Sequence, residues 1–314
     1  MGTRWNGFFF FFLVFVAMPR GVGGGAFVEA ESVPDVRAAI LAGSWYPKSA
    51  ASLIQSIDGF LSRVEPPPLE GELIAIIVPH AGHAYSGQVA AHAYRHVKGK
   101  AFRRVILLGP SHHMRFRGVS VNLQSGYETP LGLVSVDRHL GRKLLDAGSH
   151  IRWVKEAHAR EHALEIQLPF LQRVLGDFQI VPMLMGRQDY ETCSTLATTL
   201  TQVLGNTEGT LILASSDLSH FHASPRARVL DFQFIKRVQA LDPTGLAQDL
   251  ATGACEACGG GPVISTLMTA QNMGADRGMI LSYANSGDVT GDHRRVVGYL
   301  SSALVKSSDR GLHR

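Results

Sequence analysis

The stretch LIAIIVPHAGH, residues 73–83, decides the fold, because an apolar run leads directly into a turn that carries two histidines. The stretch VILLGPSHH, residues 105–113, has the same plan, and LILASSDLSH, residues 211–220, ends in an Asp and a His. Short apolar runs bounded by Gly, Pro or Ser are typical of buried strands. In open α/β sheets the chemistry gathers outside the carboxyl ends of the strands. These stretches therefore predict a site of His and Asp side chains at one edge of a sheet.

Helical patterns alternate with apolar runs along the rest of the chain. Strands separated by helices of about 10–15 residues indicate βαβ units and a mostly parallel sheet. The last two apolar runs, 279–284 and 296–305, are joined by a short loop, so we expect them to pair antiparallel. The sequence predicts a single α/β domain over residues 31–308, with a mostly parallel central sheet covered by helices. The other expected elements are helices near 49–64, 87–97, 138–147, 161–175, 190–204 and one ending near 271, and strands at 179–184 and 210–214.

The charge balance argues against a nucleic-acid partner. The chain of 314 residues has a formal net charge of only +4 and no Lys/Arg run long enough to follow a phosphate backbone. Its three cysteines are an odd number and do not indicate a disulfide framework. Cys255 and Cys258 form a CxxC pair, which is a weak signal for zinc without a second pair. The 14 histidines are many for this length and need an explanation.

The N-terminus carries a separate signal. The apolar run FFFFFLVFVA, residues 8–17, follows Arg4 and precedes a Gly-rich stretch and the sequence VEA at 28–30. Such a run is too short to span a bilayer comfortably and fits the hydrophobic region of a secretory signal. We therefore expect residues 1–30 to lie outside the fold and the protein to be exported or periplasmic. We expect it to contact a membrane only through this segment. An uncleaved anchor, or a cytoplasmic protein that starts at Met18, is the alternative.

Two histidines and one cysteine form the candidate metal site. His80 and His112 follow equivalent strands, and Cys258 precedes a GGGP turn that opens a helix. The dipole at that helix N-terminus favours the thiolate form of Cys258. Two imidazoles and a thiolate suit zinc, copper or iron and leave coordination positions open for water or substrate. The alternative is that each of the three is an ordinary turn residue.

Asp217 and His220 are candidates for acid–base chemistry beside this site. They end the third apolar run in the sequence SSDLSH. The SSD triplet can orient an imidazole by hydrogen bonding, and His220 can act as a general base. The alternative for Asp217 is a cap on the next segment. The chain contains no GxSxG, Walker A or GxGxxG sequence, so hydrolase, P-loop and Rossmann functions have no support.

The sequence HAREH, residues 158–162, spells HxxEH, the pattern of the inverzincin zinc proteases. On one helix its two histidines would share a face and bind zinc. Pro169 disfavours one continuous helix, and no downstream helix supplies an obvious carboxylate ligand. The protease interpretation is therefore not favoured. We instead expect His162, together with Glu165, to line a cleft and to donate or accept a proton beside a metal.

Six short motifs occur in fixed order along the chain. They are AGSWYP (42–47), PHAG (79–82), GPSHH (109–113), EHALEIQLP (161–169), SSDLSH (215–220) and CG (258–259). This series resembles the Memo family, whose prokaryotic members are called AmmeMemoRadiSam system protein B, and the resemblance covers residues 35–305. It implies the fold of class III extradiol dioxygenases, which hold non-haem iron with two His and a carboxylate.

The resemblance also implies site residues. The family's metal ligands match His80, His112 and Cys258. His220, Asp217 and His162 then stand around the cleft as the candidates for catalysis. Cys takes the place of the dioxygenases' Glu, and a soft thiolate favours iron or copper redox chemistry over ring cleavage.

One position departs from the family pattern. His83 stands where the family generally has Tyr, which predicts a fourth imidazole near the metal.

The sequence thus predicts a protein that holds iron or copper, with zinc also suited. Its expected function is redox or oxygen-linked chemistry on an unidentified small molecule or peptide. The alternatives are a non-catalytic module that binds a peptide or a metal, and an extradiol-type dioxygenase. The family further implies a functional link to AMMECR-type and radical SAM proteins.

Overall fold

Three parallel strands form the centre of the sheet, because each is an almost unbroken apolar run: β2 (Glu72–Val78), β3 (Arg104–Pro110) and β9 (Thr210–Ser215). Their side chains alternate between the two faces, so Leu107 packs into one hydrophobic core and Ile106 into the other. Strands buried on both faces are expected to be apolar throughout. The computed structural model describes residues 35–205 and 208–308, so the predicted signal segment lies outside the described residues.

Twelve strands make up the sheet, in the order β1-β5-β6-β8-β3-β9-β2-β12-β10, with β11 paired to β12 and β4 joining β7 and β8. The central pairs are parallel, and the predicted antiparallel pairing of the last two long strands is confirmed in β11 and β12. The other strands are β1 Val36–Arg37, β4 Val119–Val121, β5 Gly126–Thr129, β6 Gly132–Val136, β7 Ile151–Arg152, β8 Gln179–Met185, β10 His220–His222, β11 Arg277–Asn285 and β12 Val296–Lys306.

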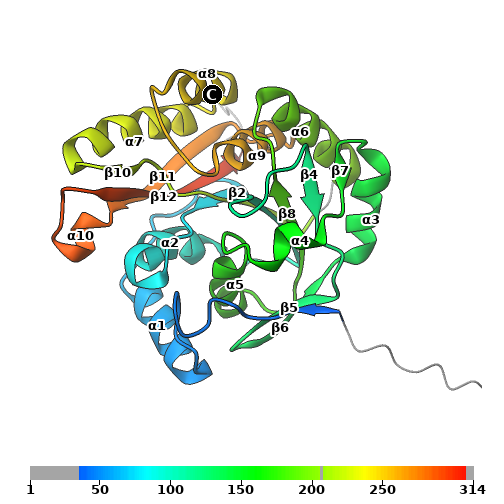
Figure 1. Cartoon of the computed structure of the whole chain (residues 1–314), viewed down its shortest axis with the longest axis horizontal. Coiled ribbons are helices and arrows are strands. Elements are labelled where there is room, and N and C mark those ends of the chain that lie inside the picture. Colours follow the sequence, from blue (N-terminus) through cyan, green and yellow to red (C-terminus); the bar gives the residue numbers. More distant parts are fainter. Residues whose placement is uncertain (1–34, 206–207, 309–314) are drawn as a thin grey trace, which may run out of the picture. The chain divides into compact units, whose positions relative to one another are not determined.

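Helices cover both faces of the sheet. The helices are α1 Ala50–Ser62, α2 His83–Val97, α3 Arg138–Ala147, α4 Lys155–Ala159, α5 Leu168–Val174, α6 Tyr190–Leu204, α7 Ser224–Gln239, α8 Pro243–Thr252, α9 Gly260–Asn272 and α10 Gly287–Thr290, with a 3-10 turn at Glu165–Gln167. Helices α1, α2 and α5 pack on one face, and α3, α6, α7, α8 and α9 pack on the other (Figure 1). The predicted α/β fold with a mostly parallel, doubly covered sheet is confirmed.

One predicted helix is wrong. Residues 161–175 form a loop, the 3-10 turn and the short α5, because Pro169 cannot donate a backbone hydrogen bond and therefore stands in the first turn of α5. The strand predicted at 210–214 is β9, which ends at Ser215, five residues before His220. His220 instead begins β10, which pairs antiparallel with β12.

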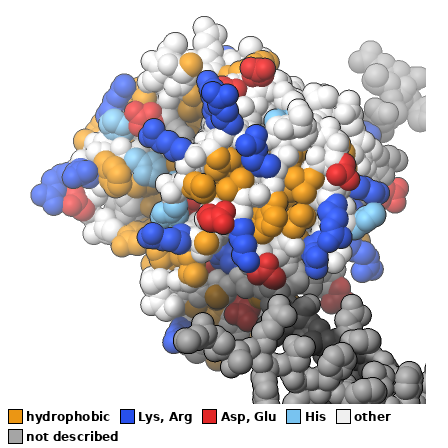
Figure 2. All heavy atoms as spheres, turned by 45° about the vertical axis from the view of Figure 1, so that its right-hand side comes forward, with side chains coloured by type: hydrophobic (Ala, Val, Ile, Leu, Met, Phe, Trp, Pro, Cys, Tyr) orange, Lys and Arg blue, Asp and Glu red, His pale blue; other side chains and the backbone are white. Residues whose placement is uncertain are grey.

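None of the helices in the described ranges is both long and apolar enough to cross a membrane. On the face shown in Figure 2, Lys and Arg side chains are scattered among hydrophobic and acidic ones.

Candidate metal centre

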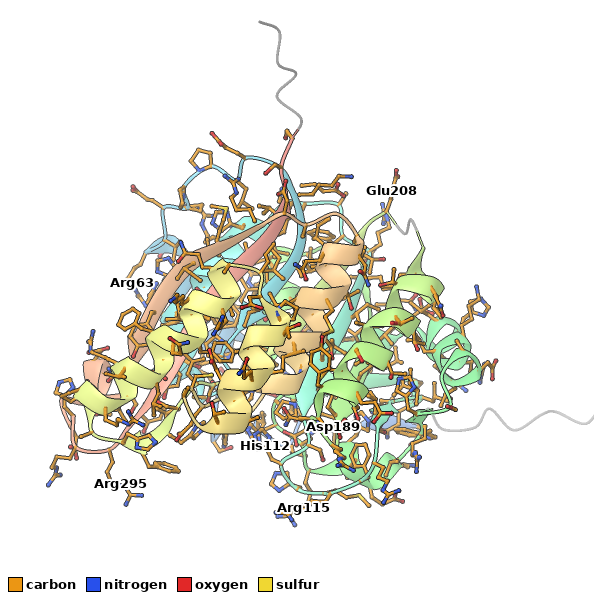
Figure 3. The ribbon with its side chains drawn as sticks, turned by 90° about the horizontal axis from the view of Figure 1, so that it is seen from above. Arg63, His112, Arg115, Asp189, Glu208 and Arg295 are labelled. Carbon is orange, nitrogen blue, oxygen red and sulfur yellow. The ribbon has the colours of Figure 1, made fainter. Side chains whose placement is uncertain are left out.

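Three neighbouring strands bring the predicted site residues to one edge of the sheet. His80 follows β2, Asp217 follows β9 and His112 follows β3, and these strands lie in the order β3-β9-β2. Cys258 reaches the same edge from the turn before α9. In Figure 3, His112 lies at the edge of the molecule opposite Glu208, which precedes β9. Strand order thus explains why residues distant in sequence meet here.

His80, His112 and Cys258 each present one donor atom, and these atoms lie within 4.8 Å of one another. Cys258 Sγ is 3.0 Å from His80 Nε2. The rings of His80 and His112 meet edge to face, with centroids 5.2 Å apart. His80 is buried, Cys258 is half-buried and His112 is exposed, so the group opens toward solvent on one side. This His/His/Cys group could hold a metal ion.

The hydrogen bonds around His80 decide which ring nitrogen faces the cysteine. The Ser215 hydroxyl donates to the Ala163 carbonyl oxygen at 2.7 Å and accepts from Gln167 Nε2 at 2.9 Å. Because its single proton is used, it accepts from His80 Nδ1, 3.0 Å away. His80 Nε2 therefore keeps its lone pair toward the Cys258 sulfur. A histidine held at Nδ1 with Nε2 free is the usual state of a metal ligand.

Glu161 holds His112 in a corresponding way. Its Oε1 accepts from His112 Nδ1 at 2.8 Å, and its two oxygens also accept the backbone N–H groups of His112, His162 and Ala163. Burial raises the pKa of this carboxyl, but the hydrogen bonds lower it to about 2. Glu161, His112 and His162 form a second cluster of donor atoms. Since both Glu161 oxygens already accept hydrogen bonds, Glu161 acts as an anchor in this arrangement.

Burial keeps imidazoles of the site neutral. It lowers the pKa of His80 and of His162 to about 3, and neutral imidazole is the form that binds a metal. Burial also raises the pKa of the Cys258 thiol, and the nearby Asp217 carboxylate adds to this effect. In the metal-free site, burial thus outweighs the stabilisation of the thiolate that we expected from the helix N-terminus. A cation bound here would favour the thiolate.

Asp217 and His220 lie on another side of the group. Asp217 accepts the backbone N–H of His80 at 2.7 Å, and burial raises the pKa of its carboxyl to about 6. Within the SSD triplet, Asp217 thus fixes the main chain of His80, while Ser215 holds the ring. His220 Nδ1 donates to the Leu218 carbonyl oxygen at 2.7 Å, which leaves Nε2 free to accept a proton.

A cavity of about 400 Å³ adjoins the group. The His162 ring lies in its wall, stacked on His112 with centroids 4.2 Å apart and 4.6 Å from the ring of Trp45. Aromatic side chains with a few polar groups are typical of a pocket for a small organic ligand. The lining residues are Ser44, Trp45, His80, Ala81, Gly82, Tyr85, His112, His162, Asp217, His220, Phe221, Val297 and Tyr299.

Two expected neighbours of the site face elsewhere. Glu165 is fully buried against Arg37 and Tyr46, so its predicted place in the cleft wall is wrong. His83 is the first residue of α2, with Nε2 3.1 Å from the Ile166 carbonyl oxygen and its ring against Phe170. The expected fourth imidazole therefore does not join the donor group, because α2 starts directly after the turn and directs His83 into the core.

The HAREH sequence does not form a zinc-protease helix, as expected. His158 lies in the last turn of α4 and is buried, with one ring nitrogen 3.0 Å from the Ser120 hydroxyl and the other 3.2 Å from that of Tyr127. Glu161 and His162 belong to the loop that follows. The other half of the CxxC pair, Cys255, is buried outside the donor group.

Two supporting residues were not predicted. Glu161, the anchor of His112, appeared in the HxxEH pattern and in the family motif EHALEIQLP, but neither pattern predicts its contact with His112. Arg37 donates to the Glu161 carbonyl oxygen and lies 124 residues from it in sequence. A lone arginine near a chain terminus carries no sequence signal for such a contact.

The fold and the donor group define the chain as an α/β protein that could bind a metal at the carboxyl edge of its sheet. Comparison with known proteins is specific: residues 37–303 match the model of the family described as Memo-like protein. The chain belongs to the Memo family, as its motifs predicted.

The alignments with its relatives span most of this chain and nearly all of each relative. A MEMO1 family protein of Methanosarcina barkeri is 36% identical over 266 residues, which are 84% of this chain and 98% of the relative. A MEMO1 family protein of Nitrosopumilus maritimus is 32% identical over 269 residues, 84% of this chain and 98% of the relative. The crystal structure of an uncharacterized Escherichia coli protein shares the fold, with a TM-score of 0.51, 11% identity, and coverage of 74% of this chain and 100% of that chain.

Proposed function

We propose that the protein holds iron or copper through His80, His112 and Cys258 and carries out redox or oxygen-linked chemistry on an organic molecule in the adjoining cavity. The observation that supports this most directly is the tautomer of His80, which Ser215 fixes with Nε2 toward the sulfur. Glu161 likewise accepts a hydrogen bond from His112 Nδ1, which leaves Nε2 of that ring with its lone pair. Both imidazoles are thus prepared as ligands by their neighbours.

The donor set fits the proposed metals. A thiolate with two imidazoles suits iron, copper and zinc, and three protein ligands leave positions open. A bound iron or copper ion would supply one-electron redox chemistry. The soft sulfur, in place of the carboxylate of extradiol dioxygenases, favours this chemistry over ring cleavage.

The residues around the cavity supply proton transfer. His220 Nε2 is free to accept a proton, because Nδ1 is held by the Leu218 carbonyl oxygen. The Asp217 carboxyl has a pKa of about 6, so it carries a proton for part of the time near neutral pH. His162 presents a neutral ring in the same wall. These three groups can bind and orient a polar ligand while the aromatic lining holds its apolar part.

The test is the metal content after anaerobic purification, measured by inductively coupled plasma mass spectrometry. We expect wild-type protein to retain a stoichiometric amount of iron or copper and a His80→Ala/Cys258→Ala variant to retain almost none. The matched control is His222→Ala/Cys255→Ala, which removes a histidine and a cysteine outside the donor group and should keep the metal. Equal metal in wild type and the site variant would refute the redox proposal and favour a non-catalytic peptide-binding module.

A second measurement separates redox chemistry from the dioxygenase alternative. Iron-loaded protein that consumes oxygen with a catechol and opens its ring would support the dioxygenase. Iron-loaded protein that leaves catechols unchanged would exclude it.

We further propose that residues 1–30 direct export, on the basis of the apolar run at 8–17. The family resemblance separately implies a functional link to AMMECR-type and radical SAM proteins. N-terminal sequencing of a C-terminally tagged protein tests the export. A mature N-terminus near residue 30 is expected, and a full-length chain in the cytosol would contradict it.

A further inference from the structure

Arg37 is buried, 4% exposed, and binds three acceptors on one segment of the chain. Its Nε donates to the His158 carbonyl oxygen at 2.7 Å, and its Nη2 donates to the Glu161 carbonyl oxygen at 2.6 Å. Its Nη1 donates to Glu165 Oε2 at 2.6 Å. The guanidinium also lies over the Tyr127 ring, 5.0 Å from its centroid. A planar fork with several fixed donors is needed to satisfy this set, and lysine does not offer one.

Glu165 extends these contacts to a second segment. Its Oε1 accepts from the Tyr46 hydroxyl at 2.6 Å and from the Leu41 N–H at 2.9 Å. The turn between these two residues carries Trp45, whose ring contacts His162 in the cavity wall. The Arg37–Glu165 pair therefore joins the Trp45 turn to the loop that carries Glu161.

The loop between α4 and the 3-10 turn depends on side-chain contacts for its shape. Residues 160–164 belong to no helix or strand. Arg37 holds the carbonyl oxygens at both ends of the span 158–161, and the Glu161 side chain then points to His112. A displaced loop would move the Glu161 carboxylate and the His162 ring together.

We propose that Arg37 and Glu165 are positioning residues of the metal centre, which fix the Glu161 loop and through it the orientation of His112. This inference rests on the proposed metal-binding function. Neither Arg37 nor Glu165 is a proposed metal ligand, and neither lines the cavity. Arg37 contacts the Glu161 loop, and Glu165 pairs with Arg37. Loss of such an outer hydrogen-bond partner typically weakens metal binding about 10–100-fold.

The experiment is an anaerobic titration of Cu(I) against a chromogenic competing chelator. We expect Arg37→Gln to bind Cu(I) about 10–100-fold more weakly than wild type. The control is Arg104→Gln, which breaks a partly buried ion pair to Asp137 (Nε to Oδ2 2.7 Å) at the amino end of β3. The control should lose thermal stability and keep the wild-type affinity. Equal weakening in both variants would overturn the inference, since general destabilisation would then explain it.

A double-variant cycle distinguishes positioning from a purely structural role. If Arg37 acts through Glu161, then Arg37→Gln/Glu161→Gln should bind Cu(I) no more weakly than Glu161→Gln alone. Additive losses would overturn the inference. Should Arg37→Gln fail to fold, Glu165→Gln replaces it in the same cycle, because it breaks the ion pair and retains an amide oxygen for Tyr46.

Hydrogen exchange separates this inference from the proposed function. In metal-free protein we expect Arg37→Gln to speed amide exchange in residues 158–163 relative to Arg104→Gln. Unchanged exchange there would overturn the inference even if wild type binds no metal. A different result would refute only the inference. If wild type and Arg37→Gln bind Cu(I) with equal affinity while Glu161→Gln binds it more weakly, the inference is refuted and the proposed function is retained.

Discussion

The two sides of the cavity are built on different principles. On the anchored side, defined by His112, Glu161 and His162, a carboxylate that is 1% exposed accepts a ring N–H and several backbone N–H groups. On the open side, defined by His220 and Phe221, the Phe221 side chain is 61% exposed and its backbone has a φ of 64°. A buried, fully satisfied polar network is rigid, whereas an exposed aromatic rim can adapt. The difference agrees with the proposal that the anchored side helps to hold a metal and the open side meets the ligand.

The largest expected effect falls on the anchored side. Glu161→Ala removes the acceptor of His112 Nδ1 and leaves backbone N–H groups of His112, His162 and Ala163 without a partner. We expect metal affinity to fall about 10–100-fold and the free energy of unfolding to fall by about 1–3 kcal/mol. A chelator-competition titration and urea unfolding measure the two effects.

The matched variant on the open side is His220→Ala, which should leave metal affinity at the wild-type level. If His220→Ala weakens metal binding as much as Glu161→Ala, the two sides do not differ in the way described.

A pH-dependent effect is expected at Asp217, between the two sides. Burial raises the pKa of its carboxyl from 3.8 to about 6, so the native state holds a proton that the unfolded chain has released. The resulting contribution to the free energy of unfolding is fully present below a pH of about 3.8 and is lost as pH rises through about 6. Asp217→Asn keeps an oxygen for the His80 N–H and removes the titration. Relative to wild type, the variant should therefore gain stability as pH rises through this range.

Urea unfolding of metal-free wild type and Asp217→Asn at several pH values between about 4 and 7 measures this difference. A constant difference across the range would show that Asp217 does not titrate there, and would remove its proposed role as a proton donor. Burial lowers the pKa of His80, His158 and His162, so their contributions to the free energy of unfolding rise with pH in both proteins. Only the difference between wild type and Asp217→Asn therefore reports on Asp217.

The smallest expected effect falls on the open side. Phe221 has a left-handed backbone that costs a non-glycine residue about 1–2 kcal/mol, whereas glycine adopts it without that cost. Phe221→Gly should raise the free energy of unfolding by up to about 1 kcal/mol after the entropy of the glycine is subtracted. Metal affinity should not change. A loss of stability would mean that the contacts of the ring with His220 and Arg295 outweigh the backbone strain.

The centre of the sheet could be predicted from sequence because it depends on local patterns. His80, His112 and Asp217 each follow an apolar run, and parallel strands carry their following turns to one edge whatever the order of the strands. Cys258 was found because a glycine-rich helix start also reaches that edge. Family motifs supported the same residues.

The supporting contacts could not be predicted, because they depend on side-chain direction and on distant pairs. His83 and His80 lie in one turn, yet the start of α2 sends His83 into the core. Glu165 looked like a cleft residue and instead pairs with Arg37, 128 residues away. No periodicity or spacing in a single sequence reports such a pair.

The place of β12 in the sheet has a consequence for how the protein is made. This strand comes last in chain order among those described, yet it lies between β2 and β10 and also pairs with β11. Its Gly298 exchanges backbone hydrogen bonds with Leu218 and Ser219, on either side of which Asp217 and His220 stand. A growing chain therefore cannot complete this side of the cavity until β12 has been synthesised. His80, His112 and Cys258 all precede this strand, so the candidate metal ligands are synthesised before the cavity beside them can be completed.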